Sequence, residues 1–170
     1  MLILAKTIDA LSFEDLMEIY IEGNREHGAE LWPEKSEQEQ LELSKQDFRC
    51  YLEADFFSKP GAVYAVWEAG GKYVSALRLE PNRDGLLMEA LETIPAQRQK
   101  GYAAALIQAV QDWLGKQGTV KIYSHVSKRN AASLATHARC GFRRLLDHTV
   151  RIDGSVNPNA YTMYYETSAE

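Results

Sequence analysis

The chain has 170 residues, of which 45% are hydrophobic and 25% are charged, a composition that supports one well-filled core and one domain. Its formal net charge of -5 argues against a nucleic-acid-binding protein, which would carry a basic surplus or a basic stripe. The two cysteines lack metal-ligand spacing and no apolar run reaches transmembrane length. We therefore expect reduced thiols, no metal site, no membrane span and a cytoplasmic protein.

The first part of the chain predicts a strand followed by a helix. Residues 2–6 are apolar and strand-like. Ser12 is suited to cap a helix with apolar positions at helical spacing, and Gly23-Asn24 is expected to end that helix. The polar stretch 25–33 is expected to be irregular.

The middle of the chain predicts a second helical region and then an antiparallel sheet. Ser36 and Ser44 can each cap a helix, because an acidic residue follows each of them three positions later, and the triplet at 59–61 is a break. Pro95 is expected to end the last strand, because it has no N–H to donate. The strands are predicted at 62–69, 72–80 and 86–94, with turns at 70–71 and 81–85.

A short basic loop then leads into an amphipathic helix. The run at 98–103 reads Arg-Gln-Lys-Gly-Tyr-Ala, and the helix that follows it is expected to end near Gly118. The first N–H groups of a helix have no internal partner, and the helix dipole adds positive charge there. The pattern predicts a phosphate site, with charge from Arg98 and Lys100 and close backbone approach at Gly101. The alternative is a solvated turn before a helix.

The C-terminal part predicts a strand, a short helix and a last pair of strands. The strand is expected at 120–126 and the helix at 130–140. The final strands are expected at 142–152 and 160–167, joined through Asp153-Gly154. Strands and helices are therefore mixed around one sheet, which is an α/β fold in the broad sense, or α+β.

Two motifs carry a family resemblance. The pattern Arg98-x-x-Gly101-x-Ala103, just after Pro95, resembles the acyl-CoA loop of the GNAT superfamily of N-acetyltransferases. Further on, Asn130, Leu134 and the pair Gly141-Phe142 resemble that family's second signature. The resemblance is specific over 86–142 and looser elsewhere.

The resemblance implies a single GNAT-like domain over residues 1–170. Its central sheet would be mixed and mostly antiparallel, with about seven strands, about four helices and splayed parallel strands at the cofactor cleft. Acceptor-side helices would span about 12–58, the acyl-CoA core about 86–142 and a C-terminal hairpin about 142–168.

The same resemblance implies a set of residues for acetyl-CoA. The loop would cradle the pyrophosphate, and the backbone of Leu91 and Thr93 would pair with the pantetheine arm like an added strand. Asn130 would lie near the pantetheine or act as a helix cap, and both roles are compatible. The implied cofactor-binding residues are Leu91, Thr93, Arg98, Gln99, Lys100, Gly101, Tyr102, Ala103, Asn130 and Ser133.

Catalytic residues are harder to assign. His137 stands where many relatives carry a tyrosine that protonates the departing thiolate, so His137 is the candidate general acid; the alternative is an exposed helix residue with no role. Glu89 is the candidate general base. In a regular strand Glu89 and Glu92 would point to opposite faces, which a bulge would alter, and the alternative for both is surface charge.

The resemblance thus implies an enzyme that transfers an acetyl group directly from acetyl-CoA to a primary amine of a small molecule or peptide. We expect no nucleic-acid or membrane partner, and the family suggests a homodimer. One alternative is a non-catalytic acyl-CoA-binding or regulatory domain on the same fold. Another is a nucleotide-binding protein, although the chain has neither of the usual glycine-rich nucleotide motifs.

Overall fold

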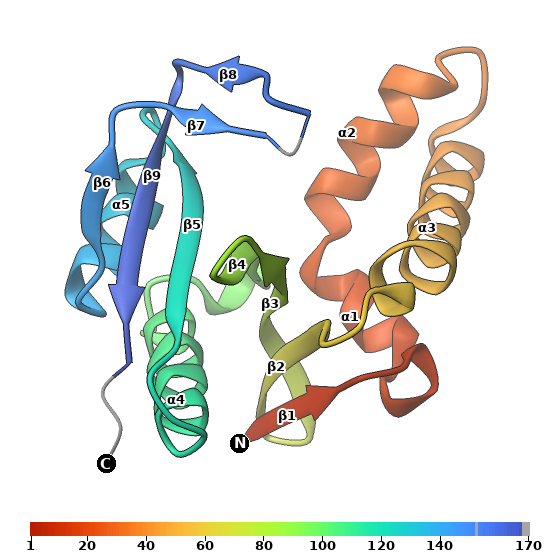
Figure 1. Ribbon diagram of the computed structural model, residues 1–170. Coiled ribbons are helices and arrows are strands. Elements are labelled where there is room, and N and C mark those ends of the chain that lie inside the picture. Colours follow the sequence, from red (N-terminus) through yellow and green to blue (C-terminus); the bar gives the residue numbers. More distant parts are fainter. Residues whose placement is uncertain (152, 168–170) are drawn as a thin grey trace.

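The computed structural model describes residues 1–151 and 153–167. Over these residues one seven-stranded sheet runs in the order β1-β2-β3-β4-β5-β9-β6, as Figure 1 shows. Its strands are β1 (Leu2–Ala5), β2 (Val63–Ala69), β3 (Lys72–Asn82), β4 (Gly85–Thr93), β5 (Lys121–Ser127), β6 (Arg143–Leu146) and β9 (Ala160–Glu166). A separate small sheet pairs β7 (Thr149–Val150) with β8 (Val156–Asn157).

Five α-helices belong to the described part of the chain. They are α1 (Phe13–Ile19), α2 (Ile21–Leu31), α3 (Glu37–Ala54), α4 (Tyr102–Gly115) and α5 (Ala131–Arg139), with short 3-10 helices at Ile8–Ala10, Phe56–Ser58 and Pro95–Gln97. None of these helices is both long and apolar enough to cross a membrane. In Figure 1, α1, α2 and α3 form one group and α4 and α5 another.

The sheet has apolar residues on both faces. Along β2, successive residues belong alternately to two hydrophobic cores. Val63 and Ala65 belong to a core with α4, whereas Tyr64 and Val66 belong to a second core with α1 and α3. Because successive strand residues point to opposite faces, each helix group covers one face of the sheet.

Strand pairing confirms the predicted sheet. All pairs in the large sheet are antiparallel except β4 and β5, which run parallel. The mixed, mostly antiparallel sheet of seven strands is therefore as expected, with one α-helix more than predicted. The predicted turn at Gly70-Gly71 is confirmed by positive φ angles of 62° and 74°, which suit glycine.

The prediction that Gly23-Asn24 ends a helix is wrong, and so is the irregular stretch at 25–33. The first helix ends at Ile19, and α2 continues through Asn24 to Leu31. Asn24 is buried and accepts a hydrogen bond from the Ser44 hydroxyl at 3.1 Å, so tertiary contact overrides its weak helix propensity. Ser44 itself lies inside α3 rather than at a cap.

Ser36 caps α3 as predicted. Its hydroxyl accepts from the Glu39 N–H, and the Glu39 carboxylate accepts from the Ser36 N–H in return, which forms a capping box. The predicted end of β4 before Pro95 is also confirmed, since the strand ends at Thr93.

The C-terminal region differs from the predicted pair of strands. The strand expected at 142–152 is divided into β6 and β7, and β9 lies between β5 and β6 in the large sheet. Ile152, the end of that predicted strand, and position 168 of the predicted hairpin lie outside the described residues.

Candidate active site

A cleft opens where the parallel strands β4 and β5 separate. They pair only from Leu86 with Ile122 to Met88 with Ser124, although β4 continues to Thr93 and β5 to Ser127. The cleft beside them has a volume of about 680 Å³ and is lined by the end of β4, the loop before α4, the first turn of α4, and α5. It is large enough for an extended organic ligand.

The cleft gathers most of the cofactor-binding residues predicted from the sequence. Nine of the ten line it, and Lys100 is the exception. The nine are Leu91, Thr93, Arg98, Gln99, Gly101, Tyr102, Ala103, Asn130 and Ser133. Their assignment as binding residues stays a prediction.

A bulge in β4 forms one wall of the cleft. Opposite β3, the register passes from the pair Arg78–Glu89 to the pair Ala76–Glu92, so two β4 residues oppose one β3 residue. The first of these two, Ala90, has a φ of 52°, which is uncommon for a residue other than glycine. The backbone is thus re-aimed just before Leu91, the first residue of β4 that lines the cleft.

The bulge also changes where two carboxylates point. Arg78 and Ala76 are two residues apart and therefore lie on one face of β3. Their partners Glu89 and Glu92 must then share that face, whereas a regular β4 would place them on opposite faces. This is the face of the core that α1 and α3 cover, because Ala76 belongs to that core.

The loop before α4 is shaped for an anion. Gln99 and Gly101 have φ angles of 63° and 84°, and Gly101 is the N-cap of the 14-residue helix without a side-chain cap. The first helical hydrogen bond joins the Ala105 N–H to the Gly101 carbonyl, so the preceding N–H groups point out of the helix end. Backbone N–H groups and the helix dipole favour a phosphate here.

The basic side chains of this loop are directed elsewhere. The Arg98 guanidinium contacts the Glu22 carboxylate of α2 at 2.6 Å and the Glu92 carboxylate at 3.0 Å, and its Nε donates to the Thr93 carbonyl at 3.3 Å. The Lys100 ammonium donates to the Gln97 side chain at 2.9 Å. The guanidinium of Arg98 thus ties α2 to the end of β4, although Arg98 also lines the cleft, and Arg139 of α5 is a second arginine in the cleft lining.

Asn130 begins α5 as a helix cap. Its side-chain oxygen accepts from the Ser133 N–H at 2.9 Å, as the sequence suggested, and Asn130 also lines the cleft. Asn130 can therefore cap α5 and line the cleft at the same time.

His137 is buried in the protein interior and does not line the cleft. Its Nδ1 lies 2.8 Å from the Ser133 carbonyl and its Nε2 lies 3.0 Å from the Ser124 hydroxyl. A carbonyl only accepts, so Nδ1 carries the proton and Nε2 accepts from Ser124. Burial lowers the His137 pKa, against the opposing effect of the Ser133 carbonyl. The imidazole is therefore neutral near pH 7, and its role as an acid stays a prediction.

Glu89 lies beside Arg78, an arginine that packs against an aromatic ring. Its carboxylate is 3.3 Å from the Arg78 guanidinium, which in turn lies over the Tyr51 ring, 4.9 Å from the ring centroid. Burial raises the Glu89 pKa, and the charge of Arg78 opposes that shift. A carboxylate with a raised pKa is a better base near neutral pH, so the environment suits the role predicted for Glu89.

Sequence reasoning missed four residues that shape the site, namely Tyr20, Glu22, Arg78 and Ser124. The Tyr20 hydroxyl donates to the Ala90 carbonyl at 2.7 Å and so holds the bulge. Each of the four acts through a partner far away in the chain, and none belongs to a local motif. An arginine in the middle of β3, between Leu77 and Leu79, was the one available signal.

Comparisons with known proteins agree with this geometry. A model of the acetyltransferase (GNAT) family matches residues 13–142. Comparison with curated protein sequences gives no match.

Several solved structures share the fold over almost the whole chain. The ribosomal-protein-S18-alanine N-acetyltransferase from Escherichia coli is 17% identical, covers 100% of this chain and 96% of its own, and has a TM-score of 0.61. The PaiA N-acetyltransferase from Thermoplasma acidophilum, solved with coenzyme A, is 15% identical with coverages of 98% and 99% and a TM-score of 0.63. The spermidine N-acetyltransferase from Vibrio cholerae, solved with CoA and spermine, is 22% identical with coverages of 99% and 96% and a TM-score of 0.59.

At these identities the solved structures establish the fold, and the family model establishes the membership. With the predicted loop, the parallel strands that separate and the bulged β4 all present, the chain belongs to the acetyltransferase (GNAT) family.

Proposed function

We propose that the protein transfers an acetyl group from acetyl-CoA directly to a primary amine. The observation that carries this proposal is the cleft of about 680 Å³ at the separation of β4 and β5, where the open N-terminus of α4 and the bulged end of β4 meet. Family membership supports acyl transfer, and acetyl-CoA as the donor is consistent with the CoA present in the PaiA structure.

The residues of the cleft suit the parts of acetyl-CoA. The N–H groups of Gly101, Tyr102 and Ala103 would hold the pyrophosphate. Beyond Met88 the edge of β4 no longer pairs with β5, so the backbone of Leu91 to Thr93 is free on that side to pair with the pantetheine amides. When bound, acetyl-CoA supplies an electrophilic thioester carbonyl and a thiolate leaving group.

The proton that the amine nitrogen loses would pass to Glu89, and CoA would leave as its thiolate. As the amine nitrogen forms its bond to the carbonyl carbon and the carbon–sulfur bond breaks, the Glu89 carboxylate takes the proton from nitrogen, directly or through water. Arg78 orients that carboxylate. Neither His137 nor Ser124 lines the cleft, so the thiolate would take its proton from solvent, and the His137–Ser124 hydrogen bond would position β5 at its last residue pair with β4.

A thiol-release assay tests the proposal. Purified protein with acetyl-CoA and a panel of primary amines should release free CoA at a rate that depends on the amine. Glu89→Gln should be much slower, and His137→Ala should be slower without being inactive, because holding the two substrates together supplies much of the rate enhancement. Full wild-type activity of His137→Ala would remove His137 from the mechanism.

A non-catalytic acyl-CoA-binding domain is the second candidate, and one observation favours it. The residue at the position of the family's general acid is a neutral, buried imidazole that does not line the cleft. Saturable binding of acetyl-CoA without turnover of any amine would establish this second candidate. A homodimer and a cytoplasmic location stay predictions in either case.

A further inference from the structure

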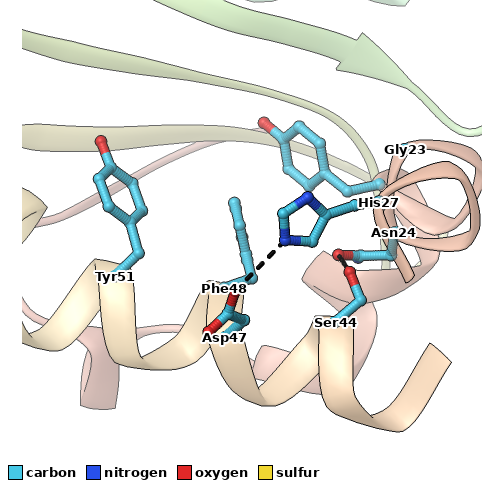
Figure 2. Close-up of a pocket in the computed structure, with 8 residues that line it drawn as sticks. Gly23, Asn24, His27, Ser44, Asp47, Phe48 and Tyr51 are labelled. Carbon is cyan, nitrogen blue, oxygen red and sulfur yellow. Dashed lines mark hydrogen bonds and ion pairs between the residues drawn. The ribbon is translucent and has the colours of Figure 1, made fainter. Parts of the chain in front are cut away.

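A second cavity lies between α2 and α3, as Figure 2 shows. Its volume is about 350 Å³, and it shares no lining residue with that cleft. Tyr20, Phe48 and Tyr51 supply aromatic walls, and His27 and Asp47 supply the polar side. A cavity of this size and lining can hold a small organic molecule.

The cavity reaches the same bulge as the acetyl-CoA cleft. Tyr20, which lines the cavity, donates its hydroxyl to the Ala90 carbonyl at 2.7 Å. The next residue along β4, Leu91, lines the acetyl-CoA cleft. Tyr20 and the Ala90–Leu91 segment of β4 therefore lie between the two spaces, so a molecule held between α2 and α3 would have to extend past Tyr20 to reach the bulge.

The polar side of the cavity carries a carboxylate. Asp47 on α3 pairs with His27 on α2 through Oδ2 at 3.3 Å, which leaves Oδ1 able to accept from a ligand. Figure 2 shows the two side chains meeting across the two helices, beside the Phe48 ring. About half of each side chain is exposed, so both are accessible. The polar atoms deeper in the cavity, on Asn24 and Ser44, are bonded to each other.

The charge of the surrounding helices favours a cation. Residues 21–54, which hold α2 and α3, contain nine Asp and Glu against four Lys and Arg, a net charge of -5. The whole chain also has a net charge of -5, so all the other residues together are neutral. Arg78 does not line the cavity, although its guanidinium lies 4.9 Å from the Tyr51 ring centroid and 5.9 Å from the Phe48 ring centroid. The Glu89 carboxylate pairs with that guanidinium at 3.3 Å. Aromatic ring faces next to a carboxylate are a favourable setting for an ammonium group.

We propose that this cavity binds the acceptor, and that the acceptor is a diamine whose second, non-reacting ammonium lies against the aromatic rings and Asp47. The inference rests on the proposed function and adds the substrate class. The reacting amine would extend past Tyr20 toward the bulge, where Glu89 takes its proton. Asp47 is then a specificity residue, because it contacts a part of the substrate that does not react.

The experiment compares cadaverine with n-hexylamine, in which a methyl group of similar size replaces the remote ammonium. We expect kcat/KM of the wild type to be about tenfold higher for cadaverine. A charge-assisted hydrogen bond at a half-exposed carboxylate contributes a free energy at the lower end of its usual range, which corresponds to about that ratio. Asp47→Asn should reduce that preference to about twofold, through a lower kcat/KM with cadaverine. Phe48→Leu should lower the preference for cadaverine over n-hexylamine by a factor of about three.

Glu53→Gln is the matched control. Glu53 is also on α3, is also about half exposed and is also in an ion pair, with Arg49 at 2.9 Å, but it does not line the cavity. The substitution removes the same charge from the same helix, so it should leave the preference for cadaverine unchanged. Equal loss of preference in Glu53→Gln and Asp47→Asn would assign the effect to general charge and overturn the inference.

The outcomes separate this inference from the proposed function. Turnover of both amines without preference, or a preference for n-hexylamine, overturns the diamine assignment and leaves acetyl transfer standing. Absence of turnover with every amine overturns the proposed function and the diamine assignment with it. Calorimetric titration of cadaverine into the CoA-loaded protein gives a readout without turnover, and the inference requires tighter binding to wild type than to Asp47→Asn.

Discussion

The hydroxyl of Tyr20 offers a direct test of how the bulge in β4 is held. Tyr20→Phe removes only the donor to the Ala90 carbonyl, at 2.7 Å, and keeps a ring that packs against Phe48 with a centroid separation of 5.5 Å. The carbonyl that loses its partner belongs to a residue with a φ of 52°, a conformation that needs support from its surroundings.

The expected loss of stability follows from that one bond. Removing the donor of a part-buried hydrogen bond costs about 1–2 kcal/mol. For 170 residues the entropy of unfolding is about 360 cal/mol/K, so the melting temperature should fall by about 3–6 °C. Because Leu91 follows the bulge and lines the cleft, the affinity for acetyl-CoA should also weaken, by about threefold or more.

Thermal unfolding and acetyl-CoA titration of Tyr20→Phe provide the assay, with Tyr73→Phe as the control. The Tyr73 hydroxyl accepts from the Ser12 N–H at 3.2 Å and lines neither cavity. Tyr73→Phe should lower the melting temperature by a comparable amount without changing the affinity for acetyl-CoA. A Tyr20→Phe variant with wild-type melting temperature and wild-type affinity would refute the role of the hydroxyl in holding the bulge.

Three further predictions concern packing, buried charge and catalysis. Gly28→Ala should destabilise the protein by about 1–3 kcal/mol in denaturant unfolding, because its Cβ would lie 2.5 Å from the Gln40 carbonyl oxygen and force α2 and α3 apart. Burial lowers the His137 pKa from 6.5, so the stability that this residue contributes is complete above about pH 6.5 and is lost as pH falls. The free energy of unfolding of the wild type should therefore decrease relative to that of His137→Gln between pH 7 and pH 5. Parallel curves of unfolding free energy against pH would contradict the assignment. Burial raises the Glu89 pKa, so wild-type kcat/KM should rise with pH through that pKa, and Glu89→Gln should lower kcat about 100-fold and lack that rise.

Local signals in the sequence predicted the parts of the fold that local chemistry determines. Gly70-Gly71 adopts positive φ angles at a hairpin, Ser36 forms a capping box, and Pro95 follows the end of β4. Each depends on residues within a few positions of one another. The loop before α4 is of the same kind, because the conformation of Gly101 and the open helix end follow from the run at 98–103.

The features that the sequence did not predict depend on contacts between segments that are distant in the chain. Asn24 looked like a helix end but is buried against Ser44, which looked like a cap and lies inside α3. Arg98 looked like a phosphate ligand, yet two carboxylates, one of them Glu22 on α2, take up its guanidinium. The positive φ of Ala90 has no local signal, because a hydrogen bond from Tyr20 in another part of the chain supports it.

The bulge also explains why the candidate base was ambiguous. In a regular strand only one of Glu89 and Glu92 would face the core covered by α1 and α3, and the sequence alone does not show which. The extra residue in β4 places both on that face, where Arg98 holds Glu92 and Arg78 holds Glu89. Burial of Glu89, with its raised pKa, makes it the better candidate base.

A thermal-shift titration with acetyl-CoA, CoA, ATP and NAD tests the central claim most directly. A ligand that binds only the folded protein raises its apparent stability in proportion to the logarithm of its concentration above Kd. We predict a melting temperature that keeps rising with the logarithm of acetyl-CoA or CoA concentration, and no rise with ATP or NAD. No shift with either CoA species, or a shift confined to ATP or NAD, would contradict the assignment of the cleft between β4 and β5 to acetyl-CoA.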